Sequence, residues 1–153
     1  MIGSDIRGNR ALAARLYLEV FGLGHLDEAD AILAPGVVSH PPGAPPRPGT
    51  DGIKQQATVL RVAIPDLRVD LEDQLAEGDR VASRWRAYGT QTGPLRLPTG
   101  EVPPSGLPIE FAEIRIDRFV AGRIVESWFI PDRFSLWTQL GLIPAPAPAP
   151  APR

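Results

Sequence analysis

One stretch near the C-terminus, IVESWFIPD at residues 124–132, carries the chain from a strand pattern into a helix pattern. The residues up to Ile130 are almost wholly apolar, and four apolar residues then follow at helical spacing: Phe134, Leu136, Trp137 and Leu140. Asp132 stands at this junction. It is either the N-cap of a final helix that ends at Leu140 or a functional carboxylate at the mouth of an apolar pocket.

Working back from this junction, apolar and polar residues alternate, which predicts a series of antiparallel strands. The turn signal EGDR at residues 77–80 joins two of them, and the second places Trp85 on one face and Tyr88 on the other. Two more strands follow at about 109–120 and 123–130.

The first third of the chain has a helical rhythm instead. Apolar spacing predicts helices over residues 5–22, 26–33 and 50–62, with a short strand at 37–40 between the second and the third. Helices first and sheet later indicate an α+β fold with the helices on one face of the sheet. A strongly curved sheet that is closed by helices makes a cone with an apolar interior, which is a natural ligand cavity.

The 153 residues suffice for one domain, which we place at residues 1–143. Residues 144–153 form a Pro-Ala repeat, expected to be an extended, polyproline-like tail that is either passive or a docking peptide. Two further segments, 41–48 and 91–108, are rich in proline. We expect them to be loops that act either as lids or as inert edges.

Composition excludes several classes of function. A formal net charge of −2 gives no electrostatic reason to expect nucleic acid or an anionic membrane as partner. The chain has no Cys, which excludes disulfides and thiolate chemistry, and its two His lack metal-binding spacing, so no metal site is predicted. No apolar stretch approaches the length of about 20 residues that a membrane span needs, and a cytoplasmic location is expected.

At this point the chain resembles the SnoaL-like polyketide cyclases of the nuclear-transport-factor-two-like superfamily. The segments that carry the resemblance cover nearly everything from about residue 9 to 142: LYLEVF at 16–21, GHLDE at 24–28, APGVVSH at 34–40, IPDL at 64–67, EGDRVASRW at 77–85, GRIVESW at 122–128, and Asp132 with QLG at 139–141.

The resemblance implies an α+β cone with helices on its concave face, dimerisation through the outer sheet face and a pocket for a small, mostly apolar molecule. In the cyclases that the chain resembles, an aspartate matching Asp132 acts as general acid/base in an intramolecular aldol closure, with no metal and no organic cofactor. This sequence departs from them in its Pro-rich segments and in Ser127, where some members have His.

Asp132 and His40 are therefore the candidate catalytic residues, with His40 as partner or polarising donor, or else as a structural hydrogen-bonding group. Glu126 is expected to pair with Arg84 or Arg115, on a neighbouring strand. The candidate substrate-binding residues are the aromatic side chains Tyr17, Phe21, Tyr88 and Trp128.

These features predict a cofactor-independent cyclase or isomerase that acts on a small hydrophobic, polyketide-like metabolite by proton transfer in an apolar pocket. Two alternatives stay open. One is a non-catalytic module of the same fold that binds a small ligand or a partner. The other is an epoxide hydrolase, for which the sequence shows no clear Asp-Arg-Asp set. A homodimer or higher homo-oligomer is expected.

Overall fold

The computed structural model describes residues 5–148. Helix α1 (Ile6–Arg15) continues without a break into the π-helical segment η1 (Leu16–Leu23), and α2 (Glu28–Ile32), α3 (Asp51–Ala63) and α4 (Arg133–Gln139) follow. The strands are β1 (Leu33–His40), β2 (Arg47–Pro48), β3 (Arg68–Glu77), β4 (Arg80–Thr90), β5 (Leu95–Leu97), β6 (Gly100–Val102), β7 (Pro108–Val120) and β8 (Arg123–Pro131).

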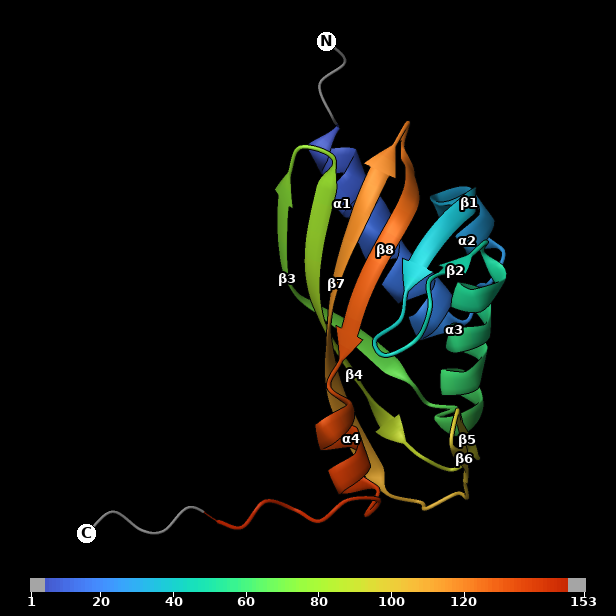
Figure 1. Ribbon diagram of the computed structural model, residues 1–153, viewed down its shortest axis with the longest axis vertical. Coiled ribbons are helices and arrows are strands. Elements are labelled where there is room, and N and C mark those ends of the chain that lie inside the picture. Colours follow the sequence, from blue (N-terminus) through green and yellow to red (C-terminus); the bar gives the residue numbers. More distant parts are fainter. Residues whose placement is uncertain (1–4, 149–153) are drawn as a thin grey trace, which may run out of the picture.

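Six strands form one curved sheet in the order β2-β1-β8-β7-β4-β3 (Figure 1). All neighbours are antiparallel except β1 and β8, which run parallel. The main core contains side chains of α1, η1, α2 and α3 together with β1, β4, β7 and β8. The helices thus cover one face of the sheet, here called the inner face, and the predicted α+β architecture is confirmed.

The alternation of side chains along β4 and β7 positions everything that follows. Trp85 is 1% exposed on the inner face, as the sequence predicted, and Tyr88 lies on the outer face. Strand β8 departs from simple alternation because a bulge leaves Val125 without an opposite residue on β7. Ile124 is therefore buried, although strict alternation would place it on the outer face with Trp128.

The Pro-rich segment 91–108 is not a plain loop. It contains the β5–β6 hairpin, and Leu95 packs in a second core cluster beneath α3 and α4. Gln91 is fully buried and holds the segment through the backbone of Gly93, Pro103 and Ser105. Gln91 and Leu95 therefore anchor this segment to the core, while residues 98–101 and 103–108 are exposed.

The described segment after α4 has little regular structure. Residues 144–148 of the Pro-Ala tail carry neither helix nor strand, and the rest of the tail, residues 149–153, lies outside the described residues. Among residues 5–148 no helix is long and apolar enough to cross a membrane.

Candidate active site

Asp132 caps helix α4. Its Oδ1 accepts a hydrogen bond from the backbone N–H of Ser135 at 3.0 Å, and its Oδ2 accepts one from the Ser135 hydroxyl at 2.7 Å. The side chain is exposed, and these hydrogen bonds lower the pKa of Asp132 below its ordinary value. The cap, one of the two roles that the sequence left open, is the geometry observed. The acid/base role of Asp132 stays a prediction.

His40 lies on the outer face, at the end of β1. Its Nε2 is 2.9 Å from Oε1 of Glu126, and its ring stacks on Trp128 with 5.1 Å between the ring centroids. The carboxylate of Glu126 also accepts from Arg118 at 3.0 Å, so the expected pairing with an arginine on a neighbouring strand occurs with a different arginine. The side chain of His40 is hydrogen-bonded to Glu126, and that of Asp132 is hydrogen-bonded to Ser135. The structure does not join the two predicted catalytic residues.

The four predicted substrate-binding residues divide between the two faces. Tyr17 and Phe21 of η1 line an interior cavity of about 20 Å³, which has room for about one water molecule. Tyr88 and Trp128 lie on the outer face, where strand alternation puts them. Their role as substrate contacts stays a prediction, one that this cavity does not support. The remaining lining residues are mostly apolar: Leu60, Leu67, Val69, Trp85, Ala87, Phe111 and Glu113.

Three charged residues on the inner face of β7 were not predicted as site residues, and Arg115 among them was named only as an expected partner of Glu126. Glu113, Arg115 and Asp117 follow one another at alternate positions and are 6%, 0% and 1% exposed. We call these three residues the buried charged row. Phe111 and Phe119 occupy the same alternate positions, but Ile114 and Ile116 occupy the other set, so the alternation alone does not identify the inner face.

Arg115 organises the row. Its Nε donates to the Tyr17 hydroxyl at 3.0 Å and to Glu113 Oε1 at 3.4 Å, and its Nη1 donates to Ser127 Oγ at 3.2 Å. The guanidinium also stacks over Phe129, 4.8 Å from the ring centroid. The cation is thus held in one orientation by partners from η1, β7 and β8.

Burial sets the electrostatics of the row. It raises the pKa of Glu113 above the ordinary 4.5, while the nearby Arg115 opposes the rise. Burial likewise raises the pKa of Asp117. A carboxyl whose pKa is raised towards neutrality is suited to give and take protons near pH 7.

Glu113 and Tyr17 place two polar groups in the otherwise apolar cavity. The oxygen of Tyr17 accepts from Arg115, which leaves the hydroxyl hydrogen of Tyr17 available for a ligand oxygen. A hydrogen bond received from a cation also polarises the hydroxyl as a donor. The cavity therefore combines a proton-transfer group with a donor for a carbonyl oxygen.

Comparisons with known proteins agree on the family. The sequence model of the SnoaL-like polyketide cyclases matches residues 11–140. A solved structure from Jannaschia sp. CCS1, provisionally named a SnoaL-like polyketide cyclase, is 26% identical with a TM-score of 0.80, covering 94% of this chain and 99% of that one. No curated protein matched the chain.

Two Streptomyces structures are also similar. IdmH of Streptomyces antibioticus, provisionally named a polyketide cyclase, is 32% identical with a TM-score of 0.72, covering 87% of this chain and 98% of that one. AclR of Streptomyces galilaeus, provisionally named a hydroxylase, shares the fold at 23% identity and a TM-score of 0.80, covering 94% of this chain and 87% of that one. With the family match over most of its length, this chain belongs to the SnoaL-like polyketide cyclase family.

Proposed function

We propose that the chain is a cytoplasmic, cofactor-independent cyclase or isomerase that acts on a small hydrophobic, polyketide-like metabolite. Family membership and the names of the similar structures support this class of enzyme. The observation that carries the proposal is the Glu113 carboxyl, which lines an apolar cavity beside Tyr17 and has a pKa raised by burial.

In this proposal Glu113 is the general acid/base and Tyr17 donates to a substrate carbonyl oxygen. Glu113 moves a proton between two atoms of one bound molecule, as an aldol closure or an isomerisation requires. Arg115 donates hydrogen bonds to both groups and so holds them in place. Because the cavity admits only about one water molecule, a substrate must displace some of the lining side chains when it binds.

Asp132 remains the competing candidate for the acid/base. It lines a surface groove of about 490 Å³ together with Ile114, Ile130 and Phe134, and Glu113 belongs to the lining of that groove as well. A substrate held in the groove would meet both Asp132 and Glu113, while one held in the interior cavity would meet Glu113 but not Asp132. The two candidates make different predictions for the same assay.

The test is turnover of a panel of β-keto esters, polyketide anthrones and epoxides by the wild type and by Glu113→Gln, Asp132→Asn and His40→Gln, at matched melting temperature. We expect Glu113→Gln to lose about 100-fold or more in kcat/KM and the other two variants to stay close to the wild type. A loss confined to Asp132→Asn would transfer the role to Asp132. No turnover, with panel compounds that still raise the melting temperature, would instead support a ligand-binding module.

We also propose that two copies associate through the outer sheet face. Ile114 of β7 and Ile130 of β8 are 54% and 70% exposed there, and Phe134 of α4, which is 59% exposed, lines the same groove. Apolar side chains that gather on an exposed sheet face favour burial against a second copy. Light scattering after size exclusion should give twice the chain mass, and Ile130→Lys should shift it towards the monomer. A monomeric wild type would overturn this part of the proposal.

A further inference from the structure

The buried charged row holds two carboxyls but one cation. Glu113, Arg115 and Asp117 are almost completely removed from solvent, so their charges are poorly hydrated. With both carboxyls ionised, the row would carry a net charge of −1 in the core, which is costly without a further partner. With one carboxyl protonated, the row is neutral. Charge balance therefore favours the retention of one proton in the row at neutral pH.

The hydrogen bonds of the two carboxyls differ, and those of Oδ1 favour Asp117 as the anion, although its Oδ2 is buried with no hydrogen-bond partner among the described residues. Arg115 has only donors, so Ser127 Oγ accepts from Nη1, and the hydrogen of Ser127 can be donated to Asp117. Ser127 Oγ and Asp117 Oδ1 are 2.5 Å apart, within the short range of an O–H···O⁻ hydrogen bond. By contrast, Glu113 Oε1 has a long contact of 3.4 Å with an Nε that lies closer to Tyr17.

We propose that Asp117 is the ionised anchor of the row, acting on Arg115 through Ser127, and that Glu113 carries the retained proton. Asp117 is then a positioning residue, and the group that faces the cavity at rest is a carboxylic acid. The charged and titratable groups around Glu113 are Arg115 and Asp117 on its own strand, Tyr17 on η1 and Arg133 at the start of α4. The negative charge of Asp117 favours the protonated form of Glu113.

A protonated Glu113 in the resting protein restricts the class of substrate. This step rests on the proposed function. The matching substrate is an enolised 1,3-dicarbonyl compound with a second carbonyl in the same molecule. As the enol carbon bonds to that carbonyl carbon, the carbon–oxygen π bond opens and its oxygen takes the Glu113 proton. The enol O–H gives its proton to the other oxygen of Glu113 and becomes a ketone. Glu113 ends as it began, with no net gain or loss of protons or electrons.

The first test needs no substrate and no variant. Infrared spectra of the wild-type protein at pH 7 should contain the C=O band of a protonated carboxylic acid. We expect the band to move to lower frequency when the protein is made with carboxyl-13C glutamate, and to stay in place with carboxyl-13C aspartate. A band that moves with labelled aspartate, or the absence of any such band, would overturn the proposal.

Variants then test the role of Asp117. In Asp117→Asn the negative charge is gone, so Glu113 should ionise against Arg115 and its band should be lost at pH 7. In Ser127→Ala, Asp117 loses the hydroxyl that donates to it. Part of the carboxylic acid band should then shift when the protein is made with carboxyl-13C aspartate. Ser83→Ala, which removes another buried inner-face hydroxyl, should leave the glutamate band unchanged. A glutamate band that persists in Asp117→Asn would show that Asp117 does not control the proton.

The two proposals fail separately. If the glutamate band is found but no compound of the panel is turned over, the proton assignment holds and the enzymatic role fails. If compounds are turned over but the band belongs to aspartate, the enzyme stands and the assignment is wrong. A substrate comparison completes the test: freely enolised 1,3-diketones should react, while analogues with both hydrogens of the central carbon replaced by methyl groups should not.

Discussion

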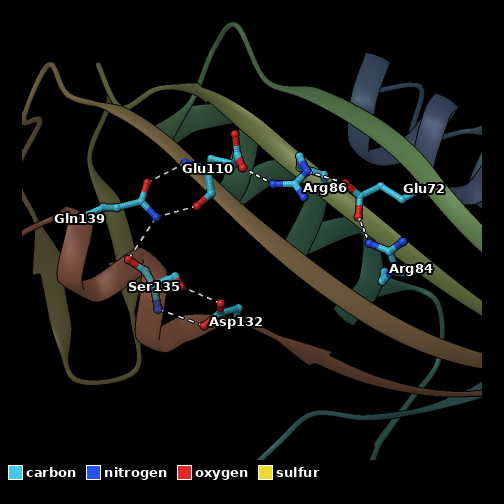
Figure 2. A network of polar contacts seen from close by, with 7 residues as sticks. All are labelled: Glu72, Arg84, Arg86, Glu110, Asp132, Ser135 and Gln139. Carbon is cyan, nitrogen blue, oxygen red and sulfur yellow. Dashed lines mark hydrogen bonds and ion pairs between the residues drawn. The ribbon is translucent and has the colours of Figure 1, made fainter. Parts of the chain in front are cut away.

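The two faces of the sheet carry the same kinds of charged residues, but the pKa of a carboxyl is lowered on one face and raised on the other. On the outer face, Glu72 bridges Arg84 and Arg86, and Arg86 also reaches Glu110 on β7 (Figure 2). On the inner face, Arg115 lies between Glu113 and Asp117. The Arg86 hydrogen bond lowers the pKa of Glu72, whereas burial raises that of Glu113 although it too contacts an arginine.

The difference lies in hydration and in the number of partners. The side chains of Arg86 and Glu110 are 40% and 54% exposed, so water still solvates the outer charges. Glu72 accepts from two arginines, of which Arg86 also reaches Glu110. Arg115 donates to Glu113, a hydroxyl and a phenol, and it also acts electrostatically on Asp117. An arginine nearby therefore does not by itself make a carboxyl a strong acid. Where carboxyls are buried and outnumber the cations beside them, one carboxyl keeps its proton. Proton transfer needs such an environment.

The largest effect should come from removing the inner cation. Arg115→Leu leaves two buried carboxyls without a charge partner, and we expect it to lower the free energy of unfolding by about 3–5 kcal/mol. Urea denaturation at pH 7 measures this loss. Arg86→Leu is the matched outer-face control. It should lower the free energy of unfolding much less, because water can solvate the carboxylates that lose Arg86. Equal losses in both variants would remove the distinction between the faces.

A smaller effect should appear in the pH dependence of stability. Because the folded pKa of Glu113 is raised, the folded protein binds this proton more tightly than the unfolded chain. Its stabilising contribution is complete below the ordinary pKa of 4.5 and is lost as the pH rises towards the folded value. The loss should amount to at most about 1.4 kcal/mol per pH unit, and Glu113→Gln should remove it.

Glu72→Gln is the control of opposite sign for this experiment. The folded pKa of Glu72 is lowered, so its contribution is present above the ordinary pKa and is lost as the pH falls. Urea denaturation from about pH 3 to pH 8, a range that extends well below the ordinary pKa of 4.5, should therefore show the two variants departing from the wild type at opposite ends. A wild type and a Glu113→Gln variant with parallel curves above pH 4.5 would contradict a raised pKa for Glu113.

The sequence predicted the local features of the fold well. The alternation in β4, the turn at residues 77–80 and the N-cap alternative for Asp132 all depend on neighbours within a few residues, and the structure contains all three. The hairpin β5–β6 was missed because prolines in residues 91–108 suggested an irregular loop. Its stability depends on the buried amide of Gln91, which no local pattern reveals.

The candidate site was harder to predict because it depends on distant pairings. His40 was placed near Asp132 because both lie at element ends, but its orientation follows from the parallel β1–β8 pairing that sets it opposite Trp128. In β7 both sets of alternate residues contain charges, so the pattern alone does not say that Arg115 faces inward. Only the register with Ser83 on β4 and the partner Tyr17 on η1 decides that orientation.

The smallest effect belongs to Asp132, on the solvated side. Asp132→Ala removes the side-chain acceptor of the Ser135 N–H and should cost about 1 kcal/mol at pH 7, while Asp132→Asn, which still caps, should cost only a fraction of this. Since the pKa of Asp132 is lowered, part of the alanine deficit should disappear as the pH falls below 3.8. Thermal denaturation of the three proteins measures both effects. A wild type that is less stable than Asp132→Ala would mean that the exposed carboxylate is kept at a cost in stability, as functional groups are, and would return the acid/base role to Asp132.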